Sequence, residues 1–283
     1  MLIAIDASSA LVRTPSGVGR YTGQLIAGLK RLQAEDSGSR LVFLSNRYDV
    51  ATAENVSGLL PQDVYARDRL PSRLLWTQAG IPLSLRRMVP DVCHFPNHLA
   101  PVIRGADTRV VVTMHDMSVY RCPQYHTRKT VAVHRAIMPL LARTDCLIIA
   151  PSNSAAEDIV DCLHVSPERV WTVYAGVAAQ YGPDVPSDDS DAAVLARYGL
   201  NRPYVLSVGT LEPRKNHLRL IEAFTELVRQ ERLPHSLVIA GTRGWKDRPL
   251  IERTRELRQG DQVRLLGYVR SADLPALYRR ADM

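Results

Sequence analysis

Short apolar runs alternate with amphipathic segments along most of the chain. This alternation predicts an α/β fold in which crossover helices join parallel strands. Leu25, Leu29 and Leu32 follow Tyr21 at helical spacing, which places all four on one face of a predicted helix. In the first part of the chain, strands are predicted at residues 2–5, 41–44, 92–95, 110–113, 146–149 and 170–173.

A polar stretch with prolines at residues 182–191 interrupts the pattern and predicts a domain boundary. It separates an N-terminal domain, residues 1–181, from a C-terminal domain, residues 192–283. The second domain is predicted to have a helix at 192–198, strands at 204–208, 237–240 and 263–266, and a last helix beginning near Ser271. Since three strands are few for a doubly wound unit, we expect two Rossmann-like domains, the second incomplete.

The composition is typical of a globular protein and has more basic than acidic residues. Hydrophobic residues make up 46% and charged residues 23%, which argues against disorder. The net charge of +7 favours anionic partners such as phosphorylated ligands or lipid headgroups. Nucleic acid is not expected, because no helix-turn-helix or aromatic–basic pattern accompanies the charge. The N-terminus lacks a signal-peptide pattern and the four cysteines lack paired spacing, so we expect reduced thiols and a cytoplasmic location.

The strongest candidate site follows the strand predicted at 204–208. Gly209 permits a tight turn, and Asn216 is a plausible N-cap for a helix with an apolar face of Leu218, Ile221, Phe224 and Leu227. A helix N-terminus offers free N–H groups and partial positive charge. Together with the adjacent cations Arg214 and Lys215, these features predict a phosphate or diphosphate site; the alternative is an ordinary surface turn.

Two further candidates follow predicted strands of the first domain. Gly17 and Gly19 resemble a dinucleotide fingerprint, but they come too late after the strand, so a flexible loop over a phosphate-bearing substrate fits better. His115 and Asp116 emerge at the carboxyl end of a strand, where open parallel sheets bind ligands, and they are candidate catalytic residues.

Three other groups of residues carry weaker signals. Tyr268 and Val269 follow a strand and could meet a nucleotide base. His94 and His98 have helical spacing, but the proline between them argues against a zinc pair, and no metal site is expected. The carboxylates at residues 189–191 lie in the predicted linker and are interpreted as solvated charge.

The order of these motifs resembles glycosyltransferase family four, the glycosyl transferases group 1, which have the GT-B fold. The resemblance covers the whole chain. It is carried by Gly17-Val-Gly19-Arg20-Tyr21, Asp91-Val-Cys-His-Phe-Pro-Asn97, His115-Asp116, Pro151-Ser-Asn-Ser-Ala-Ala-Glu-Asp158, Val208-Gly-Thr-Leu-Glu-Pro-Arg-Lys-Asn216 and Leu265-Leu-Gly-Tyr-Val269.

The resemblance implies transfer of a sugar, often mannose, from a nucleotide diphosphate sugar with retention of configuration and without a metal or other cofactor. The acceptor would be a saccharide or a lipid-linked saccharide. By the same resemblance, Arg214 and Lys215 hold the donor diphosphate and Gly17, Gly19 and Gly209 lie against it. His115 contacts the transferred sugar, and Tyr268 and Val269 flank the base.

Three departures from the family pattern qualify these expectations. Thr210 stands where many members carry an arginine, and Ala175-Gly176 replaces a frequent Asn-Gly. A pair of glutamates that normally binds the donor should lie just beyond Met283, so this chain is expected to lack full activity. The alternatives are a non-catalytic nucleotide- or membrane-binding remnant of such an enzyme and, with less support, an NAD(P)-dependent oxidoreductase.

The segment at residues 67–87 carries a separate hypothesis. Its five arginines interleave with leucines and Trp76, a composition that suits an anionic membrane surface. The alternative is a helix that packs one face on the core and leaves its arginines in solvent. A peripheral contact with the inner face of the membrane and an ordinary core helix both fit the sequence.

Overall fold

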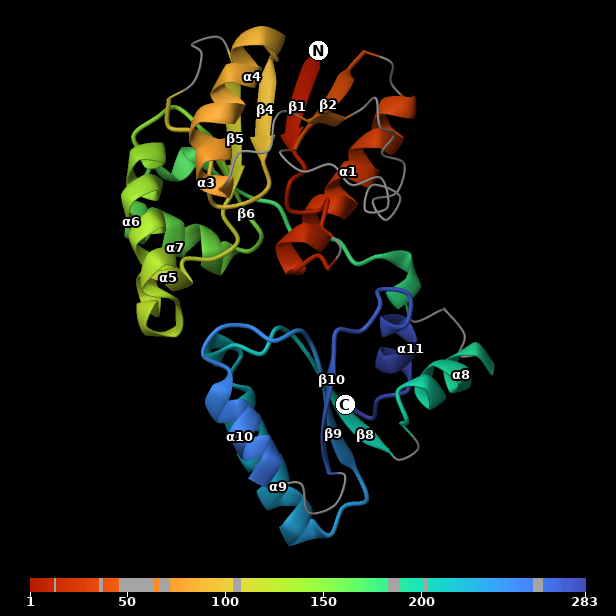
Figure 1. The fold of residues 1–283 in the computed structure, drawn as a ribbon. Helices are drawn as coiled ribbons and strands as arrows, with labels where there is room; N and C mark the ends of the chain where they lie inside the picture. The colour runs from red at the N-terminus through yellow and green to blue at the C-terminus, as the bar shows by residue number, and fades with distance from the viewer. Residues whose placement is uncertain are drawn as a thin grey trace. The chain divides into compact units, whose positions relative to one another are not determined.

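The computed structural model describes residues 1–12, 14–35, 38–45, 64–66, 72–103, 108–182, 189–200, 203–256 and 262–283. The chain divides into two compact units (Figure 1). The first comprises Met1–Pro123 and Arg128–Gly176, and the second comprises Gln124–Thr127 and Val177–Met283. Each unit is an α/β structure built on a parallel sheet, as the alternating pattern predicts.

The first unit contains a seven-stranded parallel sheet in the order β3-β2-β1-β4-β5-β6-β7. The strands are β1 (Leu2–Asp6), β2 (Arg40–Ser45), β3 (Val64–Ala66), β4 (Val92–Phe95), β5 (Arg109–Thr113), β6 (Leu147–Ala150) and β7 (Val170–Thr172). The strand order reverses between β1 and β4, which creates a topological switch point at their carboxyl ends. Strand β3 is the one strand of this sheet that the sequence pattern does not predict.

Helices and short helical turns connect these strands. They are α1 (Gly17–Glu35), α3 (Arg73–Leu75), the π-helical turn η2 (Trp76–Gly80), α4 (Ile81–Met88), α5 (Ser118–Arg121), η3 (Pro123–Tyr125), α6 (Arg128–Ala142), α7 (Asn153–Leu163) and η4 (Pro167–Arg169). Helix α1 is predicted correctly, but its buried face is Gly19, Thr22 and Ile26 rather than the face of Tyr21 and Leu25. The small residues lie inward because the helix packs closely against the loop after β1.

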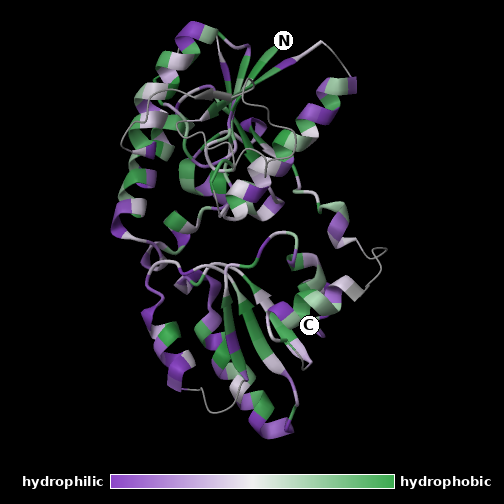
Figure 2. Ribbon diagram, turned by 45° about the vertical axis from the view of Figure 1, so that its right-hand side comes forward, coloured by the Kyte–Doolittle hydropathy of each residue, from purple (hydrophilic) through white to green (hydrophobic). Residues whose placement is uncertain are grey.

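The second unit contains a three-stranded parallel sheet in the order β10-β9-β8. Its strands are β8 (Tyr204–Val208), β9 (Ser236–Ala240) and β10 (Val263–Gly267). Its helices and turns are η5 (Ala179–Tyr181), α8 (Asp189–Arg197), η6 (Pro213–Lys215), α9 (His217–Glu231), α10 (Arg248–Glu256) and α11 (Leu274–Arg279). All five residues of the central strand β9 are buried, and hydrophobic residues follow the strands in Figure 2.

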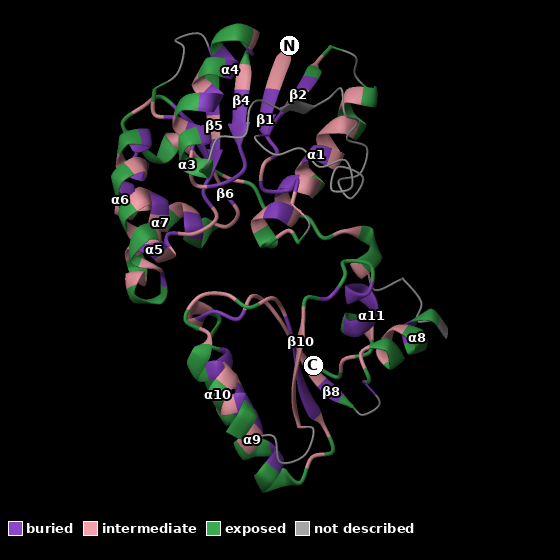
Figure 3. Ribbon diagram, in the orientation of Figure 1, coloured by how far each residue is buried: buried purple, intermediate pink, exposed green. Residues whose placement is uncertain are grey.

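Clusters of buried apolar side chains hold each sheet against its helices (Figure 3). In the first unit, Phe95, Val112 and Ile148 from adjacent strands pack with Leu141 and Ile159 of the covering helices. Two smaller clusters lie on the two faces of the second sheet. The four cysteines are free, and Cys93 and Cys146 are buried in the larger core.

The boundary between the units differs from the predicted linker at residues 182–191. The units divide after Gly176, and Asp189–Asp191 form the first turn of α8. Asp191 is not solvated: its side chain is 1% exposed and forms an ion pair of 2.6 Å with Arg279 of α11. The sequence pattern misses this pairing because the partner lies 88 residues further along the chain.

Asp273 joins the same two helices and makes stability depend on pH. Its buried carboxylate accepts hydrogen bonds from Arg270, Tyr198 and Arg197 at 2.8–3.1 Å. The hydrogen bond from Arg270, followed by those from Tyr198 and Arg197, outweighs burial and lowers the pKa of Asp273 to about 2. A lowered carboxyl pKa stabilises the fold above the ordinary value near 4, and that stability is lost as the pH falls toward 2.

We therefore expect Asp273→Asn to remove roughly 2 kcal/mol of unfolding free energy at pH 6, from about 1.4 kcal/mol per pKa unit. The difference between the two proteins should shrink as the pH falls from 4 to 2. Urea unfolding of both proteins across this range measures it. A difference that stays constant with pH would contradict the assignment.

Candidate active site

The carboxyl ends of β1 and β4 meet at the switch point of the first sheet, where polar side chains gather. Asp6 ends β1 and is 1% exposed. Its carboxylate accepts hydrogen bonds from the Ser8 backbone N–H at 3.0 Å and from Asn97 Nδ2 at 3.2 Å. Asn97 follows β4, so this contact ties the two loops together across the switch point. These residues frame the position at which doubly wound sheets bind ligands.

The predicted glycine loop proves to be the first turn of α1. Gly17 begins the helix, and Gly19 and Gly23 lie within it. The expectation of a flexible loop is therefore wrong. A Cβ on Gly19 would lie 2.3 Å from the Ser9 carbonyl oxygen, so glycine is required for α1 to approach the loop after β1. A Cβ on Gly17 would meet nothing within 4 Å, which leaves open space beside the helix N-terminus and suits an anion.

His115 follows β5 and is held in one orientation. Its Nε2 lies 3.1 Å from the Pro96 carbonyl oxygen, and its ring meets the Tyr21 ring edge-on with centroids 4.8 Å apart. A carbonyl oxygen only accepts, so Nε2 carries a proton, and this contact favours the tautomer in which Nδ1 is the acceptor. The contact with Tyr21 also brings His115 beside the helix that Gly17 begins.

The side chain of Asp116 forms hydrogen bonds within its own loop. Its Oδ1 accepts hydrogen bonds from the Ser118 backbone N–H at 2.9 Å and from Ser118 Oγ at 2.5 Å. This turn starts α5 and fixes the backbone directly after His115. The catalytic role of Asp116 stays a prediction.

His94 lies in β4, next to these residues but inside the sheet. Burial, with a contribution from the neighbouring His115, lowers the pKa of His94 to about 4. It is therefore neutral near pH 7, and it shares a hydrogen bond of 2.9 Å with Thr113 Oγ1. Among the described residues, no group of three or more His, Cys, Asp or Glu side chains could hold a metal ion.

In the second unit, the loops after the three strands lie against one another through glycines. The Gly209 N–H donates to the Ala240 carbonyl at 2.9 Å, and the Gly241 N–H donates to the Gly267 carbonyl at 2.8 Å. A Cβ on Gly241 would lie 1.8 Å from the Gly209 carbonyl oxygen. This contact is possible only for glycine, so Gly241 sets the position of Gly209. Sequence reasoning did not single out Gly241.

The two adjacent cations follow in the 3₁₀ turn η6, before α9. Arg214 forms an ion pair of 2.7 Å with Glu212, whose side chain is 3% exposed. The methylene groups of Lys215 lie 3.7 Å from the place that a Gly209 Cβ would occupy, so its stem packs over the strand end. No described acidic side chain pairs with the Lys215 ammonium group, whose charge is therefore available to an anionic ligand.

Helix α9 begins as predicted, but its cap and its buried face differ. Asn216 precedes the helix with φ of 54° in the left-handed region, and its side chain makes no capping hydrogen bond. The buried face is His217, Ile221, Phe224 and Val228, whereas Leu218 and Leu227 are exposed. His217 faces inward because it lies at helical spacing from Ile221, Phe224 and Val228, which pack in the core.

Of the two residues predicted to flank the base, Tyr268 lies at the surface and Val269 lies in the core. Tyr268 is 37% exposed, and Gly267 before it has φ of 71°, a left-handed turn that glycine adopts without strain. Val269 is 3% exposed and packs in the apolar cluster with Leu274 and Leu277. Only its backbone can flank a ligand, whereas the Tyr268 side chain can do so directly.

The predicted residues thus fall into one group in each unit. Gly17, Gly19 and His115 meet at the switch point of the first sheet. Gly209, Arg214 and Lys215 join the Tyr268 loop through Gly241 at the carboxyl end of the second sheet. Of the residues that sequence reasoning missed, Asp6 carries a usable signal, a carboxylate directly after an apolar strand.

Models of two protein families match the chain. The model of the glycosyl transferases group 1 matches residues 196–283. The model described as Glycosyltransferase Family 4 matches residues 15–181, more than half of the chain. The chain belongs to glycosyltransferase family 4. Its members are enzymes that transfer glycosyl groups, so the two groups of residues belong to a glycosyltransferase.

Individual relatives agree with this assignment. The O-antigen chain mannosyltransferase B of Escherichia coli is 30% identical over an alignment of 283 positions, which covers 94% of this chain and 71% of that protein. The D-inositol 3-phosphate glycosyltransferase of Salinispora arenicola is 35% identical over an alignment of 147 positions, which covers 48% of this chain and 33% of that protein. The family 4 chain thus spans part of the length of these relatives.

Solved structures show the same GT-B fold. WaaG, a glycosyltransferase involved in lipopolysaccharide biosynthesis, matches with a TM-score of 0.72 and 14% identity, over 100% of this chain and 74% of that one. HepE of Anabaena, solved in complex with UDP and glucose, matches with a TM-score of 0.69 and 18% identity, over 99% and 72% of the two chains. At these identities the likeness establishes the fold of the family 4 chain.

Proposed function

We propose that this glycosyltransferase moves a mannosyl group from a nucleotide diphosphate sugar to a saccharide or lipid-linked saccharide acceptor, with retention of configuration and without a metal ion. The observation that carries the proposal is the turn after β8. There the Lys215 ammonium, which has no acidic partner among the described residues, lies next to the Arg214 guanidinium at the carboxyl end of a parallel sheet. Two cations at this place match the two phosphates of such a donor.

The donor sugar is proposed from the relatives. The O-antigen chain mannosyltransferase B and the serotype-specific mannosyltransferase WbdA of Escherichia coli, 30% and 31% identical to the chain, are both mannosyltransferases by name. HepE was solved with UDP and glucose, which supports a nucleotide diphosphate sugar as the donor class. Mannose is the sugar that these names favour.

We propose the chemistry that the family resemblance implies, and the charges beside the second sheet and the orientation of His115 are compatible with it. The bond between the anomeric carbon and the diphosphate oxygen breaks, and negative charge grows on the leaving diphosphate. Lys215 and Arg214 stabilise this charge without a metal ion. The acceptor oxygen bonds to the same face of the anomeric carbon, and its proton passes to the departing phosphate oxygen. His115 Nδ1 accepts a hydrogen bond from a hydroxyl of the transferred sugar and holds it in place.

Calorimetry with GDP, UDP and ADP tests the donor site. We expect one diphosphate to bind, with unchanged affinity after EDTA treatment, because the cations belong to the protein. Release of that diphosphate from its mannose conjugate, in the presence of a mannoside acceptor, measures transfer. Failure of all three nucleotides to bind would contradict the donor site, and a requirement for a divalent ion would contradict metal independence.

We also propose that the arginine-rich segment at residues 67–87 contacts a membrane surface, where a lipid-linked acceptor would lie. Residues 67–71 of the arginine-rich segment lie outside the described residues. In the remainder, Trp76 and Leu85 are buried, whereas Leu75 and Leu83 are each 50% exposed. The exposed Arg86 and Arg87 follow on α4. The helices thus pack on the core and also present leucines beside arginines, which suits an anionic surface. No helix among the described residues is long and apolar enough to span a bilayer.

Cosedimentation with vesicles tests this contact. We expect binding to vesicles that contain anionic phospholipid, weakened several-fold by Leu83→Glu and by high salt. Leu227→Glu is the matched control, because Leu227 is a similarly exposed leucine of α9, 48% exposed. Equal binding of the two variants, or no binding at low salt, would contradict a contact through α4.

A further inference from the structure

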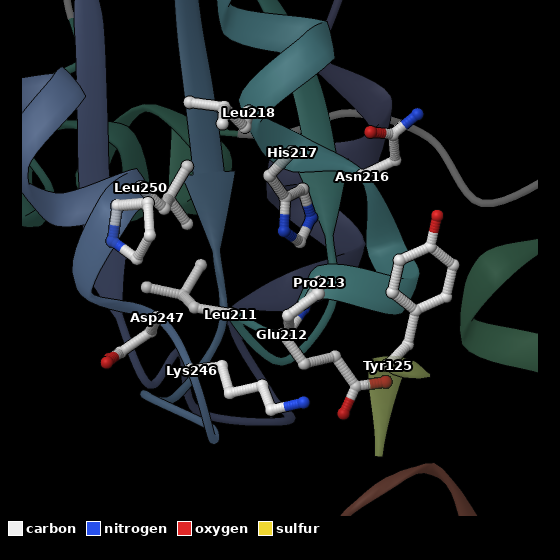
Figure 4. A pocket seen from close by; sticks show the side chains of 11 residues that line it. Tyr125, Leu211, Glu212, Pro213, Asn216, His217, Leu218, Lys246, Asp247 and Leu250 are labelled. Carbon is white, nitrogen blue, oxygen red and sulfur yellow. The ribbon is translucent and has the colours of Figure 1, made fainter. Parts of the chain in front are cut away.

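A pocket of about 230 Å³ lies in the second unit, beside the first turns of α9 and α10 (Figure 4). Glu212, His217 and Leu218 line it from the β8 side, and Asp247 and Leu250 line it from the β9 side. Tyr125, whose segment belongs to this unit, completes the wall. Arg214 and Lys215 are absent from the lining, whereas Glu212, Pro213, Asn216 and His217 on either side of them line it, so the pocket adjoins the proposed diphosphate site. Its volume lies below the roughly 300–1,000 Å³ of pockets for drug-sized ligands and suits one small ring.

His217 is the unusual residue of this pocket. It is 3% exposed, its ring points into the pocket, and its Nδ1 is buried without a hydrogen-bond partner among the described residues. Burial, with a contribution from Lys215, lowers the pKa of His217. The ring is therefore neutral near pH 7, with one nitrogen that donates and one that accepts. A buried polar atom without a partner is unfavourable, and a hydrogen bond with a ligand hydroxyl would remove that penalty.

The charged groups of the lining disfavour an anionic ligand. Glu212 and Asp247 place carboxylates on the wall, and Arg243 lowers the pKa of Asp247, which is ionised at neutral pH. The Lys246 ammonium already donates to the carbonyl oxygens of Gln124 at 2.7 Å and His126 at 3.2 Å. Both carboxylates are already ion-paired, Glu212 with Arg214 at 2.7 Å and Asp247 with Arg243 at 2.6 Å. The lining therefore leaves a phosphate no cation that lacks a partner. A neutral ligand rich in hydroxyl donors suits these acceptors better.

Apart from Asn216, the remaining lining is aliphatic or aromatic. Leu211, Pro213, Pro249 and Leu250 contribute aliphatic surface, and Tyr125 contributes an aromatic ring. A pyranose has C–H groups on its faces and hydroxyls around its rim, so it matches a pocket with both kinds of lining. We propose that this pocket binds one pyranose ring of the saccharide acceptor, outside the donor diphosphate site. The inference rests on the proposed transfer to a saccharide and adds a second sugar-binding position on the unit that carries Lys215.

Saturation-transfer NMR with methyl α-D-mannopyranoside and an α-linked mannobiose, without nucleotide, tests the pocket. We expect saturation of ring protons in both sugars and none in the open-chain alcohol mannitol. His217→Phe keeps the ring shape but removes both nitrogens, and we expect it to weaken binding at least tenfold. Its unfolding free energy should be unchanged or raised, because the unpartnered Nδ1 is gone.

Two tryptophan variants of α9 provide a second test that does not depend on His217. Leu218 lines the pocket and is 36% exposed, so Leu218→Trp should fill the pocket without disturbing the core. Leu227→Trp makes the same change at an exposed position of the same helix outside the lining. We expect Leu218→Trp to abolish sugar binding and Leu227→Trp to leave it unchanged.

Measurements of nucleotide binding by the same variants distinguish this inference from the proposed donor site. Lys215→Ala should weaken nucleotide binding and leave sugar binding intact, whereas His217→Phe should do the reverse. Displacement of the sugar by nucleotide diphosphate alone would assign the pocket to the donor and overturn the inference. Absence of sugar binding, or equal binding by the two tryptophan variants, would also overturn it, even if nucleotide binding is confirmed.

Discussion

Replacing Lys215 by alanine is expected to lower turnover by a factor of roughly 10²–10³ and to weaken nucleotide diphosphate binding at least tenfold. A hydrogen bond to a charged group contributes about 1.5–3 kcal/mol to binding, and a donor aimed at transition-state charge contributes roughly 2.7–4 kcal/mol to the barrier. The turnover effect should be larger, because the charge on the diphosphate increases as the glycosidic bond breaks.

Lys215 gives a clearer test than Arg214. Arg214 pairs at 2.7 Å with the buried Glu212, so its removal leaves a buried carboxylate and changes folding as well as binding. Lys215 has no described acidic partner, and its stem rests on Gly209 at the strand end. Loss of its ammonium group is therefore expected to weaken ligand binding with little effect on folding.

The measurement is calorimetry with the diphosphate that binds the parent protein, together with steady-state kinetics. Lys129→Ala is the matched control, because it removes an exposed lysine of α6 and changes the net charge equally. We expect the control to behave like the parent protein and Lys215→Arg to recover part of the affinity. Parental nucleotide affinity in Lys215→Ala would contradict the assignment of the diphosphate site.

Replacing Gly241 by alanine is expected to destabilise the second unit by about 3 kcal/mol or more. The added Cβ would lie 1.8 Å from the Gly209 carbonyl oxygen and 2.5 Å from its carbonyl carbon, both backbone atoms that no rotamer change can move. The loops must separate and weaken the hydrogen bond between Leu211 N–H and the Thr242 carbonyl, 2.9 Å long. Overpacking costs about 1–3 kcal/mol, and each hydrogen bond adds about 1 kcal/mol.

Urea unfolding of the two proteins measures this loss. Gly28→Ala is the matched control: a Cβ there meets nothing within 4 Å in the middle of α1, so alanine should stabilise by about 0.5–1 kcal/mol. Because Gly241 positions Gly209, the alanine variant should also lose nucleotide affinity under conditions where it is still folded. A change in unfolding free energy below about 1 kcal/mol would show that the loops adapt.

The sequence alone determined the fold class, the family and most of the strands. Strands β4 and β8 occupy the predicted residues, and the other predicted strands differ at their ends. The phosphate-site motif at Arg214 and Lys215 is also visible in sequence. These features are local, because apolar runs, glycine turns and short motifs depend on residues close together in the chain.

Tertiary structure decided the features that depend on partners distant in the chain. The sequence pattern predicts that Asp191 is a solvated residue of the linker. In the structure it is buried and forms an ion pair with Arg279. Gly19 and Gly241 are required by the Ser9 and Gly209 backbones, which sequence periodicity does not locate. His217 faces inward because α9 packs the face of Ile221, Phe224 and Val228 on the core. Close approach and burial depend on which segments meet in space, whereas the hydrophobic pattern records only which positions are apolar.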